Sequence, residues 1–392
     1  MGMNARSRIR YGMAGGGEGA FIGAVHRMAA AIDGEYALVC GAFSSDADRN
    51  RRSAEALGLD SARTYPTLEA LLAAEAALPE DERMEALAIV TPNHLHAPMA
   101  IAALDAGFHV FSEKPVALNL DEALAIDAAV ARSGKLYGLT FTYSGYPLVE
   151  EARVRVARGD LGAIRLVQVE YSQGWLSQPI DRDGQKQAEW RTDPARAGRS
   201  ACLADIGVHA FSLAHFVSGM APCEVAADLT TFVPGRRLDD NAHVLMRYAS
   251  GARGVLVASQ VSPGNYNRLS VKIYGDKAGL EWYAHEPEYL HFCEFGKPHV
   301  ILTRGGAGVG GEAARVSRMP AEHPEGYVEG FGNLYRDAIA LISARRRGEL
   351  MDSGLAALVP SVEDGLLGMR FIEASVDSNE AGGVWTPVAT QL

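Results

Sequence analysis

The chain has 392 residues, more than one ordinary domain of about 100 to 200 residues, so we expect two domains. Hydrophobic residues make up 48% and charged residues 22%, proportions that are typical of globular proteins and argue against disordered, collagen and coiled-coil classes. The formal net charge of −11 opposes binding to nucleic acid or to an anionic membrane surface.

The cysteines and the apolar runs bear on the compartment. The four cysteines are widely spaced and form no C-x-x-C pair, so neither a disulfide framework nor a zinc ribbon is indicated. The first ten residues are polar, and glycines interrupt the apolar stretch that follows, unlike the core of a signal peptide. The sequence contains no run of about 20 uncharged apolar residues, so we expect no membrane span. We therefore expect a cytoplasmic protein.

The first part of the chain alternates short apolar runs with longer amphipathic stretches. The runs expected as strands are 11–15, 36–43, 86–91, 108–112 and 136–141. Apolar residues recur every three or four positions in 98–106 and 120–131, as in amphipathic helices. Parallel strands joined by crossover helices give this pattern, which predicts an α/β domain with a doubly wound parallel sheet over residues 1–146.

The pattern changes after Pro147. Helices are expected at 148–158, 204–218, 328–347 and 361–375. Strand-like runs occupy 164–171, 224–232, 242–248, 253–261, 269–274, 280–283, 289–295 and 300–302. Most of these runs are separated by turns alone, so we predict an α+β domain over 147–392 with a mostly antiparallel open sheet. The broad face of such a sheet commonly pairs with another subunit, which predicts a homodimer or homotetramer.

A glycine-rich turn follows the first strand directly and opens a helix. Its spacing, Gly15-x-Gly17-x-x-Ala20, fits a dinucleotide-binding fingerprint, while Gly23 offers a second alignment with a turn about three residues longer. Glycines let the backbone approach a pyrophosphate, which N–H groups at the helix start then bind. This is a Rossmann-type turn for NAD(P), and the residues expected to contact the cofactor are Gly15, Gly17, Gly19, Ala20, Phe21 and Ile22.

The end of the second strand bears on the choice between NAD and NADP. An acidic residue there would bind the adenosine ribose of NAD, but Ser44 and Ser45 occupy the position and Asp46 comes next. Three arginines follow, Arg49, Arg51 and Arg52. They could meet the 2′-phosphate of NADP, although such a run is more often the solvated face of a helix. We favour NAD and leave NADP open, with Ser44 and Ser45 as cofactor contacts.

The third and fourth strands end in polar segments at the edge where open α/β sheets bind ligands. The first segment contributes Thr91, Pro92, Asn93 and His96 as expected cofactor contacts. The second is Glu113-Lys114-Pro115. Pro115 restricts Lys114 to extended backbone conformations, which favours a functional lysine over an ordinary surface lysine beside a turn. We expect Glu113 and Lys114 to contact the cofactor, and Lys114 also to contact the substrate.

Asp205 and His209 lie four residues apart at the start of a predicted helix, so they would share one face. A carboxylate beside an imidazole orients the ring and raises its basicity, as a general base near neutral pH requires. The alternative is an aspartate that caps the helix and a histidine that packs in its core. Lys114 in the first half of the chain favours the catalytic interpretation.

The motifs together resemble the Gfo/Idh/MocA oxidoreductase family. The resemblance covers about the first 215 residues and rests on Gly15 to Gly23, Thr91-Pro92-Asn93-His94, Glu113-Lys114-Pro115 and Asp205-x-Gly207-x-His209. It implies an NAD(P)-dependent dehydrogenase of sugars or inositols, with Lys114, Asp205 and His209 in the active site. The lengthened glycine turn departs from the usual family pattern.

This resemblance implies a mechanism. His209 takes the proton of a secondary hydroxyl while the hydride on the same carbon passes to the nicotinamide, Lys114 hydrogen-bonds that hydroxyl, and Asp205 holds the substrate or the imidazole. Further substrate contacts are expected from Tyr143, Gln173, Trp175 and Arg191, which supply polar partners and an apolar surface for a polyol.

Several alternatives stay open at this point. His94, His96, Cys202 and His215 lack the spacing of a closed ligand set, and we predict no metal. Within enzymes, an NAD-dependent glycoside-processing enzyme or a keto-sugar reductase would use the same residues. From a different class, a non-catalytic NAD(P)-binding regulator is possible, although the intact Lys114, Asp205 and His209 favour an enzyme.

Overall fold

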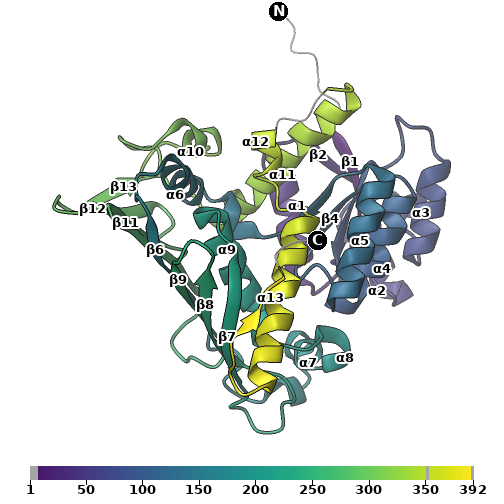
Figure 1. Ribbon diagram of the computed structural model, residues 1–392. Coiled ribbons are helices and arrows are strands. Elements are labelled where there is room, and N and C mark those ends of the chain that lie inside the picture. Colours follow the sequence, from purple (N-terminus) through teal and green to yellow (C-terminus); the bar gives the residue numbers. More distant parts are fainter. Residues whose placement is uncertain (1–7, 350–352, 390–392) are drawn as a thin grey trace, which may run out of the picture. The chain divides into compact units, whose positions relative to one another are not determined.

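The computed structural model describes residues 8–349 and 353–389, and its contacts divide the chain into two compact units (Figure 1). The first unit contains the chain up to residue 117, together with 121–140 and 331–365. The second contains 118–120, 141–330 and 366–392. This division differs from the expected boundary after residue 146, because the chain passes between the units more than once.

The first unit is built on a five-stranded parallel sheet, as the sequence predicts. The strand order is β2-β1-β3-β4-β5, and every neighbouring pair is parallel. The strands are β1 (Ile9–Gly15), β2 (Tyr36–Ala42), β3 (Ala86–Val90), β4 (His109–Ser112) and β5 (Tyr137–Leu139). All residues of β3 are buried, as expected for a central strand with both faces covered.

Helices connect these strands. They are α1 (Phe21–Ala31), α2 (Ala47–Ala56), α3 (Leu68–Ala77), α4 (His96–Asp105) and α5 (Leu120–Ser133), with most of α11 (Tyr327–Arg346) and the short α12 (Ser353–Ala356) arriving late in the chain. The Tyr335 ring on α11 lies 4.6 Å from Phe111 and 5.1 Å from Tyr36, measured between ring centroids. Burial of these aromatic rings explains why residues 331–365 belong to the first unit.

The second unit contains the mostly antiparallel sheet that the sequence predicts. Its strand order is β13-β12-β11-β10-β6-β9-β8-β7-β14. The strands are β6 (Ile164–Ser172), β7 (Pro222–Thr230), β8 (Asn241–Tyr248), β9 (Arg253–Ser259), β10 (Arg268–Gly275), β11 (Ala278–Tyr283), β12 (Tyr289–Glu294), β13 (Val300–Thr303) and β14 (Thr386–Pro387). Strands β6 and β9 pair in parallel, and the other neighbours are antiparallel.

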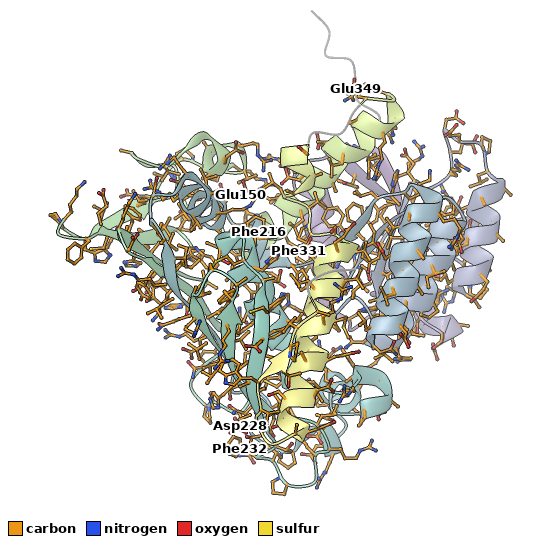
Figure 2. All side chains as sticks on the ribbon, viewed as in Figure 1. Glu150, Phe216, Asp228, Phe232, Phe331 and Glu349 are labelled. Carbon is orange, nitrogen blue, oxygen red and sulfur yellow. The ribbon has the colours of Figure 1, made fainter. Side chains whose placement is uncertain are left out.

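Helices pack against this sheet within the second unit (Figure 1). Those in contact with its strands are α6 (Pro147–Arg158), α9 (Val208–Ser218) and α13 (Val362–Glu380). The unit also contains α7 (Lys186–Arg191), α8 (Pro194–Ala197) and α10 (Gly311–Arg315). Phe211 on α9 stacks on Phe371 of α13 with a centroid distance of 4.2 Å. Figure 2 draws the side chains on these elements, with Phe216 of α9 labelled.

The segment before α9 departs from the predicted continuous helix. Residues Leu203–Gly207 form a π-helical turn, and only from Val208 does the chain continue as α9. Such turns are rare, and they often occur at functional sites. Among the helices of the described residues, none has the length and apolarity needed to cross a bilayer.

Candidate active site

The glycine turn after β1 forms a cradle made of backbone. Gly15, Gly16 and Gly19 have positive φ angles of 80°, 70° and 81°, which residues with a Cβ rarely adopt. A Cβ on Gly15 would lie 2.9 Å from the carbonyl oxygen of Val90 on β3. The turn therefore requires glycine for both its backbone conformation and its close approach to the neighbouring strand.

Gly23 fills the position at which helix and turn approach most closely. A Cβ there would lie 2.4 Å from the Cα atom of Gly16, so the later of the two alignments describes this turn. Ala20 is instead the N-cap of α1, where it offers no capping side chain. Backbone N–H groups of the first turn, which includes Phe21 and Ile22, thus face no side-chain cap, and this suits the pyrophosphate of a dinucleotide.

Ser44 and Ser45 follow β2 and lead into α2. The Ser44 Oγ accepts a hydrogen bond from the backbone N–H of Asp46 at 3.1 Å. Asp46 in turn caps α2, because its Oδ1 accepts from the backbone N–H of Arg49 at 2.7 Å. The first acidic residue after β2 is therefore engaged as a helix cap.

His96 joins the ends of β3 and β4 rather than facing solvent. Its side chain is buried, with Nδ1 2.8 Å from the Pro115 carbonyl oxygen and Nε2 2.9 Å from that of Thr91. Burial lowers the pKa of His96. Both ring nitrogens of His96 thus lie against backbone carbonyls, and its contact with the cofactor stays a prediction. Asn93 is also buried, in a 3₁₀ turn before α4.

Glu113 is the centre of a buried polar network in the first unit. Its Oε1 lies 3.0 Å from His26 Nε2 and accepts a hydrogen bond from the Thr140 hydroxyl at 2.7 Å. His26 Nδ1 lies 2.7 Å from the Tyr335 hydroxyl. Because an ionised carboxylate can only accept, His26 Nε2 carries the hydrogen of this contact. The polar atoms of Glu113 are thus engaged by His26 and Thr140, and its contact with the cofactor stays a prediction.

The pKa of Glu113 reflects this network. Burial raises the pKa, but the hydrogen bond and charge of His26, the charge of Lys114 and the Thr140 hydroxyl outweigh burial and lower it from 4.5 to about 2. Glu113 is therefore ionised at neutral pH. Lys114 follows it directly and is half-buried at the carboxyl end of β4, with a cis peptide bond to Pro115.

In the second unit, Asp205 is held by two donors on a single oxygen. Its Oδ2 accepts hydrogen bonds from the Gln260 side-chain amide at 2.8 Å and from Arg191 Nε at 3.2 Å. Gln260 is fully buried. Arg191 also donates to the Gln187 side chain at 2.6 Å, and its guanidinium lies 4.2 Å from the Trp190 ring centroid. The orientation of Asp205 is thus fixed by residues from α7 and from the end of β9.

His209 lies in the first turn of α9 with aromatic rings around it. The Tyr143 ring stands edge-on to the imidazole at a centroid distance of 5.4 Å, and Phe141 and Tyr171 lie at 5.9 Å and 6.2 Å. His209 is 8% exposed, so part of the side chain still reaches solvent. The aromatic packing fixes the ring plane of the imidazole.

Tyr143, Tyr171 and Asn267 form a closed ring of hydrogen bonds. Asn267 Nδ2 donates to the Tyr143 hydroxyl at 3.0 Å, and the Tyr171 hydroxyl donates to Asn267 Oδ1 at 2.6 Å. The two hydroxyls lie 2.8 Å apart, so Tyr143 uses its single hydrogen on Tyr171. Burial raises the pKa of both tyrosines. Tyr143 therefore packs against His209 while its hydroxyl is engaged in this ring, and its contact with the substrate stays a prediction.

Gln173 and Trp175 follow β6 and are half-buried. The Gln173 amide donates to Asn267 Oδ1 at 3.0 Å, which ties it to the tyrosine ring. The second unit thus brings Gln173, Tyr143 and His209 together through one polar and aromatic cluster. Arg191 joins Asp205 in a second group.

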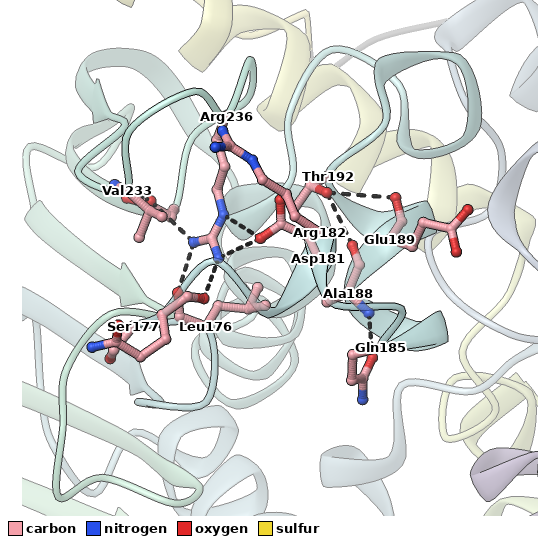
Figure 3. A network of polar contacts seen from close by, with 12 residues as sticks. Leu176, Ser177, Asp181, Arg182, Gln185, Ala188, Glu189, Thr192, Val233 and Arg236 are labelled. Atoms are coloured by element: carbon pink, nitrogen blue, oxygen red, sulfur yellow. Dashed lines mark hydrogen bonds and ion pairs between the residues drawn. The ribbon is translucent and has the colours of Figure 1, made fainter.

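Arg236 anchors the segment from Leu176 to Asp181, which follows Trp175 in the chain (Figure 3). Its guanidinium donates to the backbone carbonyls of Leu176 at 2.7 Å and Gln178 at 2.9 Å, and to Asp181 at 2.8 Å. It also contacts Asp240 Oδ2 at 3.3 Å, and its side chain is 1% exposed. Asp239 and Asp240 are both buried, and Asp240 belongs to this anchor.

Two of the histidines considered as metal ligands bond to backbone. Both ring nitrogens of His96 lie against carbonyl oxygens, and His215 Nδ1 lies 3.1 Å from the Met220 carbonyl oxygen. The described residues contain no cluster of three or more His, Cys, Asp or Glu side chains suited to a metal ion. That the protein uses no metal stays a prediction.

Comparisons with known proteins agree with this arrangement. Residues 9–141 match the model of an oxidoreductase family with an NAD-binding Rossmann fold, and residues 149–281 match the GFO/IDH/MocA C-terminal domain. The oxidoreductase YfiI of Bacillus subtilis is 34% identical over 381 residues, which cover 96% of each chain. The chain belongs to the Gfo/Idh/MocA oxidoreductase family.

Solved structures of this family extend the likeness to the whole chain. An inositol dehydrogenase homologue from Azotobacter vinelandii in complex with NAD+ is 36% identical, with a TM-score of 0.93 and 98% of both chains covered. Its complex with NADH and myo-inositol is 35% identical, with a TM-score of 0.90 and 97% and 98% of the chains covered. The family resemblance inferred from the four motifs is confirmed.

The buried charge of Glu113 predicts a pH dependence of stability. Because its pKa is lowered from 4.5 to about 2 in the folded state, its contribution is present above about pH 4.5 and is lost as pH falls toward 2. We expect Glu113→Gln to lower the thermal midpoint at pH 6, with a smaller difference from wild type at pH 3.

Thermal unfolding followed by circular dichroism at the two pH values measures this difference. Glu55→Gln, which changes an exposed carboxylate of α2, is the matched control and should show no such pH-dependent gap. An equal loss for Glu113→Gln at pH 3 and pH 6 would contradict the assignment of an ionised, paired Glu113.

Proposed function

We propose that this protein is an NAD-dependent dehydrogenase that oxidises a secondary hydroxyl of a sugar, a sugar derivative or an inositol. The observation that carries the proposal is the fixed Asp205 and His209 of the second unit, in a chain that also contains the glycine cradle and Lys114. The relative from Azotobacter vinelandii, solved with NADH and myo-inositol, supports this substrate class.

The first unit supplies the cofactor contacts. Backbone N–H groups at the glycine turn and the first turn of α1 would hold the pyrophosphate, and Ser44 and Ser45 the adenosine ribose. Thr91, Pro92 and Asn93 lie at the carboxyl end of β3, where ligands of open α/β sheets bind. When bound, the nicotinamide supplies the acceptor for a hydride.

The proposed chemistry divides among three side chains. His209 takes the proton of the substrate hydroxyl, because its ring is fixed by aromatic packing and part of it remains accessible. The Lys114 ammonium donates a hydrogen bond to the same oxygen and stabilises negative charge that develops there. Asp205, held through Oδ2 by Gln260 and Arg191, binds a neighbouring substrate hydroxyl.

The reaction can be tested by following the absorbance of reduced nicotinamide at about 340 nm as hydride is transferred. NAD and NADP are offered in parallel with inositols, D- and L-aldoses and simple glycosides. We expect a polyol-dependent rise, and a loss of about 10²- to 10⁴-fold in turnover for His209→Ala, the usual size of general-base catalysis. Undiminished turnover in His209→Ala would overturn its role.

A fluorescence titration of cofactor binding serves as the control for these variants. The wild type and His209→Ala should bind NAD equally, because His209 belongs to the second unit. Cofactor binding without turnover across the whole panel would reject polyol oxidation and favour a keto-sugar reductase, a glycoside-processing enzyme or a regulator. Product analysis with keto-sugars and glycosides then separates these three.

Gln260 allows a test of how Asp205 is held. Gln260→Met keeps the side-chain length but removes the donor to Asp205 Oδ2, so we expect kcat/KM for the polyol to fall about tenfold, the size of one lost charge-assisted hydrogen bond. NAD affinity and the thermal midpoint should change little. Gln168→Met on β6, whose side chain is half-buried, is the control, and an equal loss there would contradict a specific role for Gln260.

We further propose that the protein is a cytoplasmic homo-oligomer that binds small molecules and no nucleic acid. Its described cysteines are free, which suits a reducing compartment, and its net charge is −11. The second unit supports self-association, since Leu166 on β6 and Leu245 on β8 are 43% and 52% exposed and Val255 on β9 lies opposite Leu245 in the sheet. Such apolar sheet faces commonly pair between subunits.

Light scattering coupled to size exclusion tests the oligomer. We expect a dimer or tetramer for the wild type, and dissociation for Leu245→Glu, which places a charge on the apolar face. Leu124→Glu on α5, a leucine that is 37% exposed in the first unit, is the control and should keep the wild-type mass. A monomeric wild type, or the same mass in both variants, would reject this face as the interface.

A further inference from the structure

Arg51 and Arg52, which follow β2, form ion pairs of two kinds. Arg51 pairs with Glu55 at 2.9 Å and Asp48 at 3.6 Å, both on its own helix α2. Arg52 instead reaches out of α2 to the glycine turn. Its Nε and Nη2 each lie 3.0 Å from Oε2 of Glu18. The Arg52 guanidinium is thus engaged by a carboxylate of the turn itself.

The backbone fixes where this pair lies. The Glu18 N–H donates to the Ser53 hydroxyl on α2 at 2.9 Å. A Cβ on Gly17 would lie 2.7 Å from the Ser53 Oγ and 2.9 Å from the Phe43 carbonyl oxygen. The turn therefore packs tightly against the end of β2 and the side of α2. Glu18 and Arg52 adjoin the segment that continues from Phe43 into Ser44 and Ser45.

This place is where a dinucleotide-binding fold distinguishes NAD from NADP. In such folds an acidic residue after β2 usually binds the ribose. Here the first acidic residue after β2 is Asp46, and its carboxylate caps α2 instead. A 2′-phosphate carries about −1.5 to −2 charges at neutral pH and needs an unengaged cation. Here Arg52, which reaches the turn, is paired with Glu18, and Glu18 adds a negative charge that repels phosphate.

We propose that Glu18 determines cofactor specificity by engaging Arg52 and repelling the 2′-phosphate, so that the protein prefers NAD to NADP. Neutralising Glu18 leaves Arg52 as a phosphate ligand beside Ser44 and Ser45. The proposal deepens the proposed function, since it rests on dinucleotide binding by the first unit. It does not depend on the identity of the polyol.

The test measures the dissociation constants of NAD+ and NADP+ by fluorescence titration, with no sugar present. We expect Glu18→Gln to tighten NADP+ binding about tenfold, the size of one additional charge-assisted hydrogen bond, and to change NAD+ binding by less than about threefold on the same scale. The increase in NADP+ affinity should shrink at high salt, because the pair is exposed. The double variant Glu18→Gln/Arg52→Met should lose it.

The control is Glu55→Gln, which removes the partner of Arg51 on the same helix at a similar exposure. It removes one negative charge, as Glu18→Gln does, so a matching increase in NADP+ affinity there would overturn the specific role of Glu18. An unchanged ratio of NADP+ to NAD+ affinity in Glu18→Gln, or an increase that survives in the double variant, would also overturn it. Failure of the wild type to bind either dinucleotide would instead reject the proposed function.

Discussion

The first unit depends on the ionised carboxylate of Glu113, which is buried and must therefore be paired. Its partners arrive from separate parts of the chain: His26 from α1 and Thr140 from the end of β5, with Tyr335 of α11 behind His26. The positions of these elements depend on one another, because displacing α1 or the end of β5 would remove a hydrogen-bond donor from the buried Glu113 carboxylate. The glycine turn directly precedes α1, which carries His26, and Lys114 directly follows Glu113. The contact between His26 and Glu113 therefore helps to position both the glycine turn and Lys114.

In the second unit, the Asp205 carboxylate is also held by hydrogen bonds, which continue from Gln260 to Asp240 and Arg236. Gln260 donates to Asp205 through its side chain, while its backbone N–H donates to the Asp240 carbonyl at 2.9 Å. The Asp240 carboxylate accepts from the backbone N–H groups of Phe232 and Val233 and contacts Arg236. Asp239 accepts from the N–H groups of Ala201 and Leu203, just before Asp205. The two adjacent aspartates thus fix Asp205 from both sides.

The sequence predicts the parts of this site that lie in short motifs, because their chemistry is encoded by neighbouring residues. The glycine turn, Glu113-Lys114-Pro115 and the two sheets all follow from local patterns. The partners His26, Gln260 and Asn267 could not be predicted, since each acts through a contact with a residue distant in the chain. Gly23 offers an alternative alignment in the sequence, but only its contact with Gly16 shows which glycine packs the helix.

Several polar residues of the motifs are distinguished by their hydrogen bonds to other protein groups. His96, Glu113 and Tyr143 are polar residues of the right motifs, yet each is below a tenth exposed and uses its polar atoms on protein partners. The half-buried Lys114 and Trp175 keep part of their surface accessible. Arg236 fixes the backbone from Leu176 to Asp181 and is linked to Asp205 through Asp240 and Gln260. The backbone before α7 and the Asp205 carboxylate are therefore held by one connected set of contacts.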